Sequence, residues 1–404
     1  MRILYSIFFI AFSGVCIGQQ TTAPGAVTAD SVATEVESVE GLEERKVTTR
    51  SIEQSTPLMD KKVTRNAYGY EIPMEDAEMS ADAPLQLEET IVVANKFESM
   101  RIQAATQRTQ RSPSIAQQSE MDEAVEYLEE TSPNSFEYHY FNYAAGNYDV
   151  SRVGDLKEAE NLRPNNSDVH VQMAAFNIIN GDNNLAREYV NKMIASGRLS
   201  RSVLKYSEDI LLSTPENGTL ITHGFDDSYG TWYAQNVSGI RKDVNLISLD
   251  FMQSEHYRNA LKNKGYSIPS RENIDVDFLK AFCGLNGQKK LAVSMTTPKE
   301  YFGPILNKLY VTGVVFEYRT TQFENFERNE YLWENILKKD LLISANDEKA
   351  KSLSANYLPM LLQMRKVYNQ LGRTQDVADL DKILDRIGAQ CKKYDQVQRL
   401  KSAY

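Results

Sequence analysis

The sequence predicts a mainly helical protein with a small α/β unit inserted between helical hairpins. Between residues 121 and 214, apolar residues recur every three or four positions, which is the period of an amphipathic helix. Between 215 and 320, short apolar runs alternate with helical stretches, which is typical of parallel strands joined by crossover helices. From 321 to 404 the helical period returns, so helical hairpins flank the α/β unit on both sides.

The bulk composition excludes several classes of protein. The chain has 404 residues and a net charge of −10, which argues against a nucleic-acid partner because phosphates require clustered lysine and arginine. Its 3 cysteines cannot form a disulfide scaffold, and its 4 histidines show no spacing typical of metal sites. No phosphate-binding glycine loop or nucleophile motif is present, so motifs assign no metal, no cofactor and no catalytic residues to this chain.

The N-terminus has the pattern of an export signal. A basic start, a short apolar run and small residues before position 19 predict a signal peptide over 1–18. The alternative is a lipoprotein anchored through Cys16, although the branched Val15 is unusual before a lipid-modified cysteine. We therefore expect an exported chain, in the periplasm or cell envelope, with no transmembrane segment after processing.

Two polar regions follow the signal. Residues 19–88 contain many acidic and few aromatic residues, which predicts a disordered acidic linker. Residues 89–120 begin with a β-rich patch at 89–94 and continue as a basic connector with Arg101, Arg108 and Arg111. The patch resembles the short boxes with which outer-membrane receptors add a strand to a partner protein; the alternative is a strand that docks on the chain's own body.

Helical hairpins are predicted over 121–214. They resemble tetratricopeptide repeats, because glycines, small residues and a closing proline stand near the positions at which that repeat places them: Gly146, Ala159, Pro164, Gly181 and Ala186. The repeat's tryptophan is absent. The resemblance implies paired helices that stack on a neighbouring element and bind other proteins.

The α/β unit, predicted over 215–320, should hold a small four-stranded parallel sheet. Its strands are expected at 219–223, 244–249, 291–294 and 314–318, with a helix over 299–309 before the last strand. Sequence runs at 217–227, 232–235 and 239–244 carry a further resemblance, which extends over about 204–387. They are similar to the soluble C-terminal region of multi-spanning bacterial membrane proteins described as protein O-mannosyltransferase-like. That resemblance implies a fold and an envelope setting, and it does not imply transferase activity.

Polar residues gather where these strands end. Because ligands of open parallel sheets bind outside the carboxyl ends of the strands, we identify five candidates for a ligand crevice: His223, Asp226, Asp227, Asp250 and His256. Three interpretations stay open. The residues could hold a divalent metal or act in hydrolysis, they could line a non-catalytic ligand crevice, or they could cap helices and pack.

Aromatic residues on the predicted helices suggest a different site. The candidates for partner binding are Phe136, Tyr140, Tyr143, Trp232, Tyr357 and Tyr368. Concave aromatic faces are how helical repeats usually bind peptides, although the same residues could pack in the core. The sequence therefore favours an envelope scaffold or adaptor that binds another protein or peptide. A ligand-binding or hydrolytic α/β domain and an accessory subunit of envelope glycosylation are the alternatives.

Overall fold

The computed structural model describes residues 64–65, 71–72, 83–343 and 347–403. The described residues divide into two units, one within 21–84 and the other from residue 85 onward. Within the first unit, β1 (Thr64–Arg65) pairs antiparallel with β2 (Glu71–Ile72). The predicted signal peptide and lipid-anchor site lie outside the described residues. So does most of the predicted linker, apart from these two strands and the start of the first long helix.

That first long helix, α2 (Ala83–Thr106), covers the segment for which the sequence predicted a strand. Its Phe97 is buried and stacks on Phe141, with the ring centroids 4.1 Å apart. Ala104, two turns further along the same face, is buried as well. Packing this face against the next helices outweighs the β propensity of 89–94, because tertiary contacts override local preference. The strand prediction is wrong, and the helix begins before the predicted end of the linker.

Helices α3 to α8 form the region of predicted hairpins. The side chain of Ser114 caps α3 by accepting from the backbone N–H of Gln117, and Gly181 ends α6 in the left-handed region at φ 76°. Consecutive helices pack together, α4 with α5 and α6 with α7. Their tetratricopeptide identity stays a prediction. The elements are α3 (Ile115–Thr131), α4 (Phe136–Ala145), η2 (Val150–Arg152), α5 (Val153–Leu162), α6 (Ser167–Asn180), α7 (Asn183–Ala195) and α8 (Arg201–Ser213).

The predicted α/β unit contains a mixed sheet of five strands in the order β4-β3-β5-β7-β6. All four predicted strands are present and lie side by side. β3 pairs in parallel with β4 and β5, but β7 is antiparallel to β5 and to β6. The bounds are β3 (Thr219–Thr222), β4 (Asn245–Ser248), β5 (Leu291–Ser294), β6 (Leu309–Thr312) and β7 (Val315–Tyr318).

The prediction of an all-parallel, four-stranded sheet is therefore wrong at one edge. The sequence predicted a helix over 299–309. In the structure the helical turns end at Lys308, and Leu309 begins the strand β6, which the sequence did not predict. Gly313, at φ 57°, then reverses the chain so that β7 returns beside β5. A Cβ at Gly313 would also collide with Ser213. Because of this tight turn, the antiparallel hairpin of β6 and β7 stands where the sequence predicted a crossover between parallel strands.

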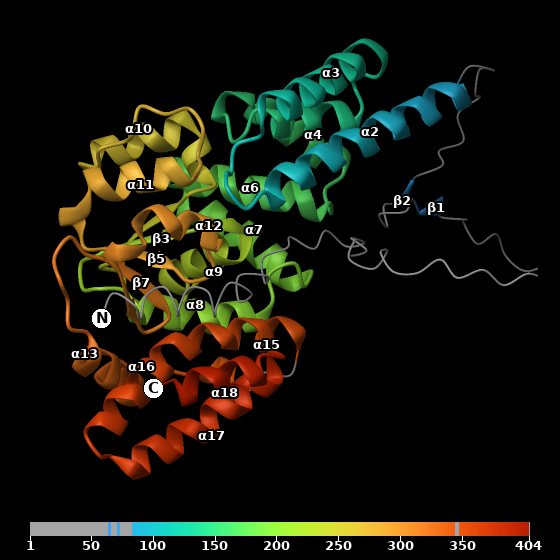
Figure 1. Cartoon of the computed structure of the whole chain (residues 1–404). Coiled ribbons are helices and arrows are strands. Elements are labelled where there is room, and N and C mark those ends of the chain that lie inside the picture. Colours follow the sequence, from blue (N-terminus) through green and yellow to red (C-terminus); the bar gives the residue numbers. More distant parts are fainter. Residues whose placement is uncertain (1–63, 66–70, 73–82, 344–346, 404) are drawn as a thin grey trace, which may run out of the picture. The chain divides into compact units, whose positions relative to one another are not determined.

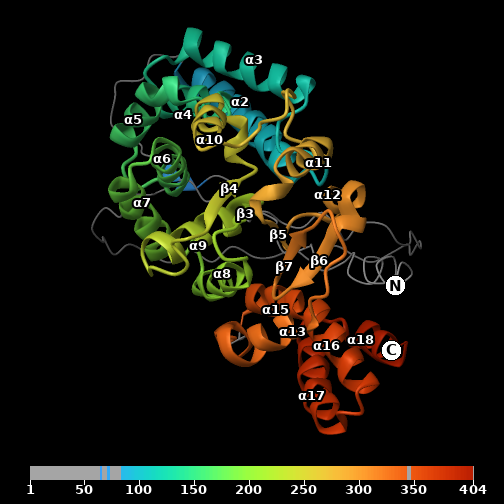
Figure 2. The same cartoon turned by 90° about the vertical axis from the view of Figure 1, so that its left-hand side faces the viewer.

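Helices cover the sheet on two sides, as Figures 1 and 2 show. In both views α2, α3, α10 and α11 lie above the sheet, and α8 and the C-terminal helices lie below it. The helical segments between the strands are α9 (Gly224–Asn236), η3 (Phe251–Gln253), α10 (Glu255–Asn263), α11 (Val276–Leu285), η4 (Gly287–Lys289), α12 (Lys299–Phe302) and η5 (Gly303–Lys308). The fold class, mainly helical with an α/β insert, is confirmed.

The C-terminal helices are joined to α8 through a buried aspartate. Asp209 of α8 accepts hydrogen bonds from the backbone N–H groups of Lys338 and Lys339 and from the hydroxyl of Tyr357, at 2.8, 3.0 and 2.6 Å. These bonds tie the segment after the last strand to α8. The elements are α13 (Phe326–Tyr331), η6 (Leu332–Ile336), α14 (Asp340–Ile343), α15 (Glu348–Ser354), η7 (Ala355–Tyr357), α16 (Leu358–Gln370), α17 (Thr374–Gln390) and α18 (Tyr394–Ser402).

Candidate functional site

The carboxyl ends of β3 and β4 meet, because the parallel register pairs Thr222 with Ser248. His223 follows the first strand directly and precedes α9, and Asp250 follows the second strand. Both side chains are buried. The backbone N–H of Gly224 donates to Asp250 Oδ2 at 2.5 Å. The structure therefore brings His223 and Asp250 together, as the sequence predicted.

The crevice is occupied by an arginine from another part of the chain. Arg111, in the connector between α2 and α3, donates to Asp250 Oδ1 from Nε at 2.8 Å and also from Nη2. Its Nη1 donates to the carbonyl of Ala105 at 2.7 Å. Burial alone would raise the pKa of Asp250. The charge of Arg111, together with His223 and the hydrogen bonds from Arg111 and Gly224, outweighs burial and lowers that pKa below its ordinary value. This is a desolvated ion pair at the place where an α/β sheet would bind a ligand.

Backbone hydrogen bonds fix the connector in this position. Arg111 N–H donates to the carbonyl of Ile274 at 2.6 Å, and Val276 N–H donates to the carbonyl of Thr109 at 3.0 Å. Ile274 N–H donates to Ser112 Oγ at 3.0 Å. The connector thus runs as a short ladder beside the residues that lead into α11. The sequence showed Arg111 as part of a basic segment and Asp250 after a strand, but it gave no sign that they pair.

His223 is held as a neutral, packed ring. Burial and, to a smaller extent, the nearby charge of Arg111 lower its pKa to about 3, although Asp250 acts in the opposite direction. The ring meets Tyr301 edge to face, with centroids 5.3 Å apart. A histidine with so low a pKa does not exchange protons near neutral pH, where a general base must work. Its place here is packing beside the ion pair.

The two aspartates at the start of α9 face different partners. Asp227 is buried and accepts a hydrogen bond from Thr296 Oγ1, beyond the end of β5. Burial raises its pKa to about 7 against the opposing effect of hydrogen bonds from Ser294 and Thr296. Asp226 instead forms an ion pair with Lys349 of α15. Each carboxylate is therefore held by the chain itself.

The fifth candidate does not join the others. His256 is exposed in the first turn of α10, and among the described residues no hydrogen bond or ion pair links it to the other four. In the part of the chain that the structure describes, no group of three or more histidine, cysteine, aspartate or glutamate side chains is placed to hold a metal ion. The arrangement favours the third interpretation, in which these residues cap and pack.

The six aromatic candidates for partner binding are all buried, so the prediction that they form a partner surface does not fit the structure. Their rings fill the core between helices, and the hydroxyl groups of three of them bind neighbouring helices. Tyr140 accepts from Arg101 at 3.0 Å, and Tyr368 donates to Glu330 at 2.9 Å. The third is Tyr357, which donates to Asp209. The rings buried in this way are Phe136, Tyr140, Tyr143, Trp232, Tyr357 and Tyr368.

A family model matches part of the chain. Residues 203–394 match a family model described as TMEM260-associated domain 2, which fits a domain associated with a membrane protein. The matched stretch runs from α8 into α18 and contains the whole five-stranded sheet. No curated protein and no solved structure matches the chain. Among the described residues, no helix has the length and apolar character needed to span a membrane.

Proposed function

We propose that the chain is a non-catalytic binding module of the cell envelope, which docks onto another protein through its helical hairpins. The observation that carries this proposal is the sealed crevice. At the strand ends, where an open α/β sheet binds its substrate or cofactor, Arg111 already pairs with Asp250. A ligand there would have to displace a buried ion pair that is fixed by backbone hydrogen bonds on both sides.

The electrostatics of the crevice support the same conclusion. Removing Arg111 from Asp250 would leave a buried, unpaired carboxylate, which costs several kcal/mol in proteins. A weak ligand cannot supply that energy by replacing one contact. The sheet thus serves as a rigid centre from which helices project on either side.

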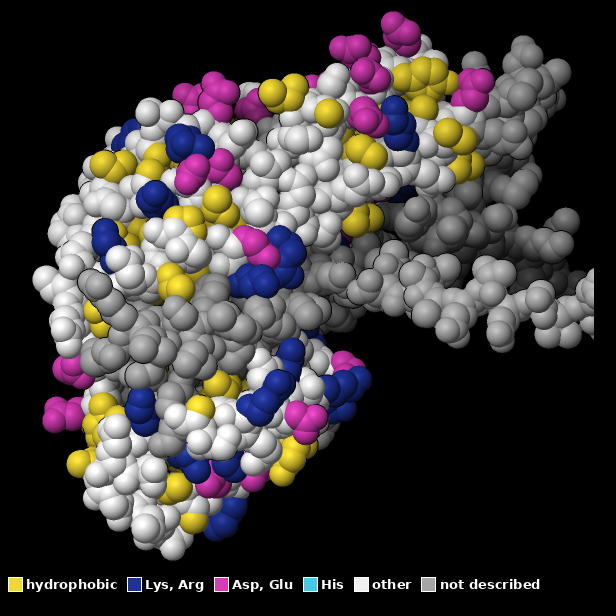
Figure 3. All heavy atoms as spheres, in the orientation of Figure 1, with side chains coloured by type: hydrophobic (Ala, Val, Ile, Leu, Met, Phe, Trp, Pro, Cys, Tyr) yellow, Lys and Arg dark blue, Asp and Glu magenta, His cyan; other side chains and the backbone are white. Residues whose placement is uncertain are grey.

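The surface indicates what kind of contact a partner would make. On the face shown in Figure 3, hydrophobic side chains are scattered and form no single large patch, and acidic side chains gather over α3. The exposed acidic residues of that helix are Asp122, Glu123, Glu126, Glu129 and Glu130. Such a surface suits a reversible, largely polar interface, because permanent interfaces are more hydrophobic.

The envelope setting rests on two supports. The predicted signal peptide directs the chain out of the cytoplasm, and residues 203–394 match a domain model named for association with TMEM260. The finer hypothesis, that the chain assists envelope glycosylation, rests on the sequence resemblance over 204–387 alone. We keep it as the more specific form of the same proposal.

Site-specific crosslinking tests the proposal. A photo-reactive residue is placed at Leu162 or Leu371, both exposed at hairpin ends. In the control it is placed at Leu285, whose exposure on the α/β part lies between those of the other two. We expect the hairpin positions, and not the control, to yield a discrete crosslinked envelope protein when the full chain is expressed in its own cells. Equal products from Leu285, or none from either hairpin position, would contradict docking through the hairpins.

A second experiment addresses catalysis or metal binding at the crevice. Melting of the full chain is followed with added Mg²⁺, Mn²⁺ or Zn²⁺. We expect no shift that depends on the crevice. A stabilisation that is lost in Asp227→Asn but kept in a variant at the exposed His256, His256→Gln, would replace the proposal with a ligand-binding or hydrolytic function.

A further inference from the structure

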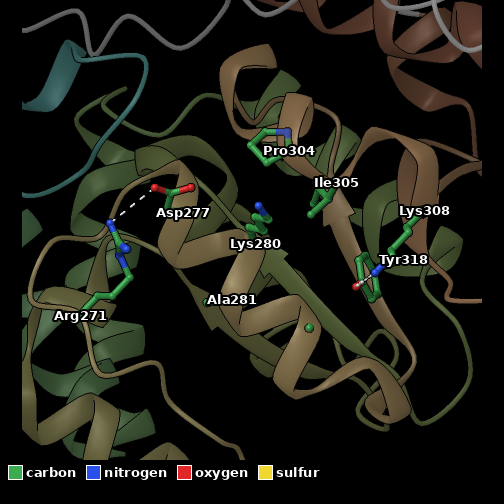
Figure 4. Close-up of a pocket in the computed structure, with 9 residues that line it drawn as sticks. Arg271, Asp277, Lys280, Ala281, Pro304, Ile305, Lys308 and Tyr318 are labelled. Atoms are coloured by element: carbon green, nitrogen blue, oxygen red, sulfur yellow. Dashed lines mark hydrogen bonds and ion pairs between the residues drawn. The ribbon is translucent and has the colours of Figure 1, made fainter.

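A surface pocket lies away from the strand ends, between α11 and η5. It has a volume of about 460 Å³, within the range of small-molecule sites. Figure 4 shows the residues that surround it, which come from the loop before α11, from α11 itself, from η5 and from β7. They are Arg271, Asp277, Lys280, Ala281, Gly284, Pro304, Ile305, Lys308 and Tyr318.

Helical spacing explains why one wall is open. The residues of α11 that face the pocket are Asp277, Lys280, Ala281 and Gly284, which are separated by three, one and three positions and so share one helix face. The last two are small. A Cβ at Gly284 would meet no atom within 4 Å, so the absence of a side chain there leaves the pocket open at that end.

Two lysines face the pocket without a carboxylate partner. Lys308 Nζ donates to the neutral hydroxyl of Tyr318 at 3.3 Å. Within the described residues, Lys280 makes no hydrogen bond or ion pair, and neither lysine forms an ion pair with a carboxylate. The pocket's only acidic residue, Asp277, lies 3.6 Å from Arg271, which also pairs with Asp275 at 3.2 Å.

The local charge therefore has the opposite sign to that of the whole chain. Counting Arg271, Lys280 and Lys308 against Asp277, the lining carries a net charge of +2, whereas the chain carries −10. Lys280 on α11 and Lys308 on η5 line the same pocket, and an anion bound between them would be attracted by both positive charges. Ile305 and Pro304 supply an apolar side, against which a small organic body could lie.

We propose that this pocket binds the phosphate or carboxylate group of a small organic molecule. The anionic group lies between Lys280 and Lys308, and the apolar part of the molecule lies against Ile305 and Pro304. Tyr318 is buried in the lining, and its hydroxyl group accepts a hydrogen bond from Lys308 and so holds that side chain. This binding activity is independent of docking through the hairpins, because none of these residues lies on them.

The test is a titration of the full chain, followed by isothermal calorimetry and by melting temperature. The probes are phenyl phosphate, phenylacetate, inorganic phosphate and the uncharged benzyl alcohol. We expect saturable binding of at least one of the two aromatic anions, weaker binding of inorganic phosphate and no binding of benzyl alcohol. The comparison of phenyl phosphate with phenylacetate tells which anionic group the site prefers.

Matched variants separate the pocket from general charge. Lys280→Gln should weaken the binding of the preferred probe about threefold to tenfold, because it removes one charge that faces the ligand. Lys382→Gln removes the same charge from an exposed position of α17 and should leave the affinity unchanged. Gly284→Phe should abolish binding by filling the open end, whereas Gly284→Ala should retain it.

Two results would overturn the proposal. One is the absence of saturable binding for every probe up to about 10 mM, a concentration at which even a weak specific site would fill. The other is an equal loss of affinity in Lys382→Gln and Lys280→Gln, which would show nonspecific attraction. Neither result bears on the crosslinking experiment above, so the two proposals fail separately.

Discussion

The buried ion pair between Arg111 and Asp250 makes a sharp prediction about stability. Arg111→Met keeps most of the side-chain length but removes the guanidinium group. The carboxylate of Asp250 then stays buried without a counter-charge, and the carbonyl of Ala105 loses its donor. Only 8% of the Arg111 side chain and 9% of the Asp250 side chain are exposed, so water can replace little of what is lost. Removing one member of such a pair costs about 3–5 kcal/mol.

A neighbouring arginine provides the matched control. Arg108 pairs with Glu300 at 3.0 Å, but 41% and 26% of these side chains are exposed. Arg108→Met should therefore lower the free energy of unfolding by no more than about 1 kcal/mol. Urea unfolding followed by circular dichroism gives both values by linear extrapolation. The double variant Arg111→Met with Asp250→Asn should lose less than Arg111→Met alone. A loss for Arg111→Met as small as that for Arg108→Met would show that Asp250 does not depend on Arg111 as a buried counter-charge.

Two further predictions concern buried aspartates. Burial raises the pKa of Asp227 to about 7 from 3.8, so the folded state holds its proton more tightly than the unfolded state, and stability falls as the pH rises from about 4 through 7. About three pKa units correspond to roughly 4 kcal/mol at most. Asp227→Asn should flatten the profile of unfolding free energy between about pH 4 and 7, and an unchanged slope there would contradict this. Asp209→Ala leaves three donors without their acceptor and should cost about 3 kcal/mol or more in urea unfolding. A loss below about 1 kcal/mol would show that the donors find other partners.

Local pattern was sufficient for most of the fold. The predicted strands at 219–223 and 291–294 correspond to β3 and β5, because apolar runs bounded by turn residues depend on few distant contacts. The predicted turn at Gly181 is a helix end with the left-handed backbone that glycine favours.

The failures come from long-range packing. The β-branched patch 89–94 becomes helical because Phe97 stacks on a ring 44 positions away, which no local preference reveals. The strand β6 was missed because its residues continue the apolar pattern of the helix before it. The antiparallel pairing of β7 with β5 was missed for the same reason, because it depends on the turn at Gly313. That turn packs closely against Ser213, which is again a tertiary contact.

The candidate site shows the same division. That the strand ends would place His223 near Asp250 follows from the topology of parallel strands. The topology does not indicate that Arg111 fills the space between α2 and the sheet, because 139 positions separate Arg111 from Asp250. The pocket of Lys280 and Lys308 likewise needs two elements to face each other, and only the spacing on α11 was visible in the sequence.

Amide hydrogen exchange at Gly224 is the most direct test of the account. Its N–H donates to Asp250, which also accepts from Arg111 of the connector, so we expect water to reach this amide only when the connector moves away from Asp250. We predict that this amide, together with that of Arg111, exchanges as slowly as amides of the central strand β3. Exchange at Gly224 near the rate of an unstructured peptide, while β3 stays protected, would show an open crevice and contradict the account.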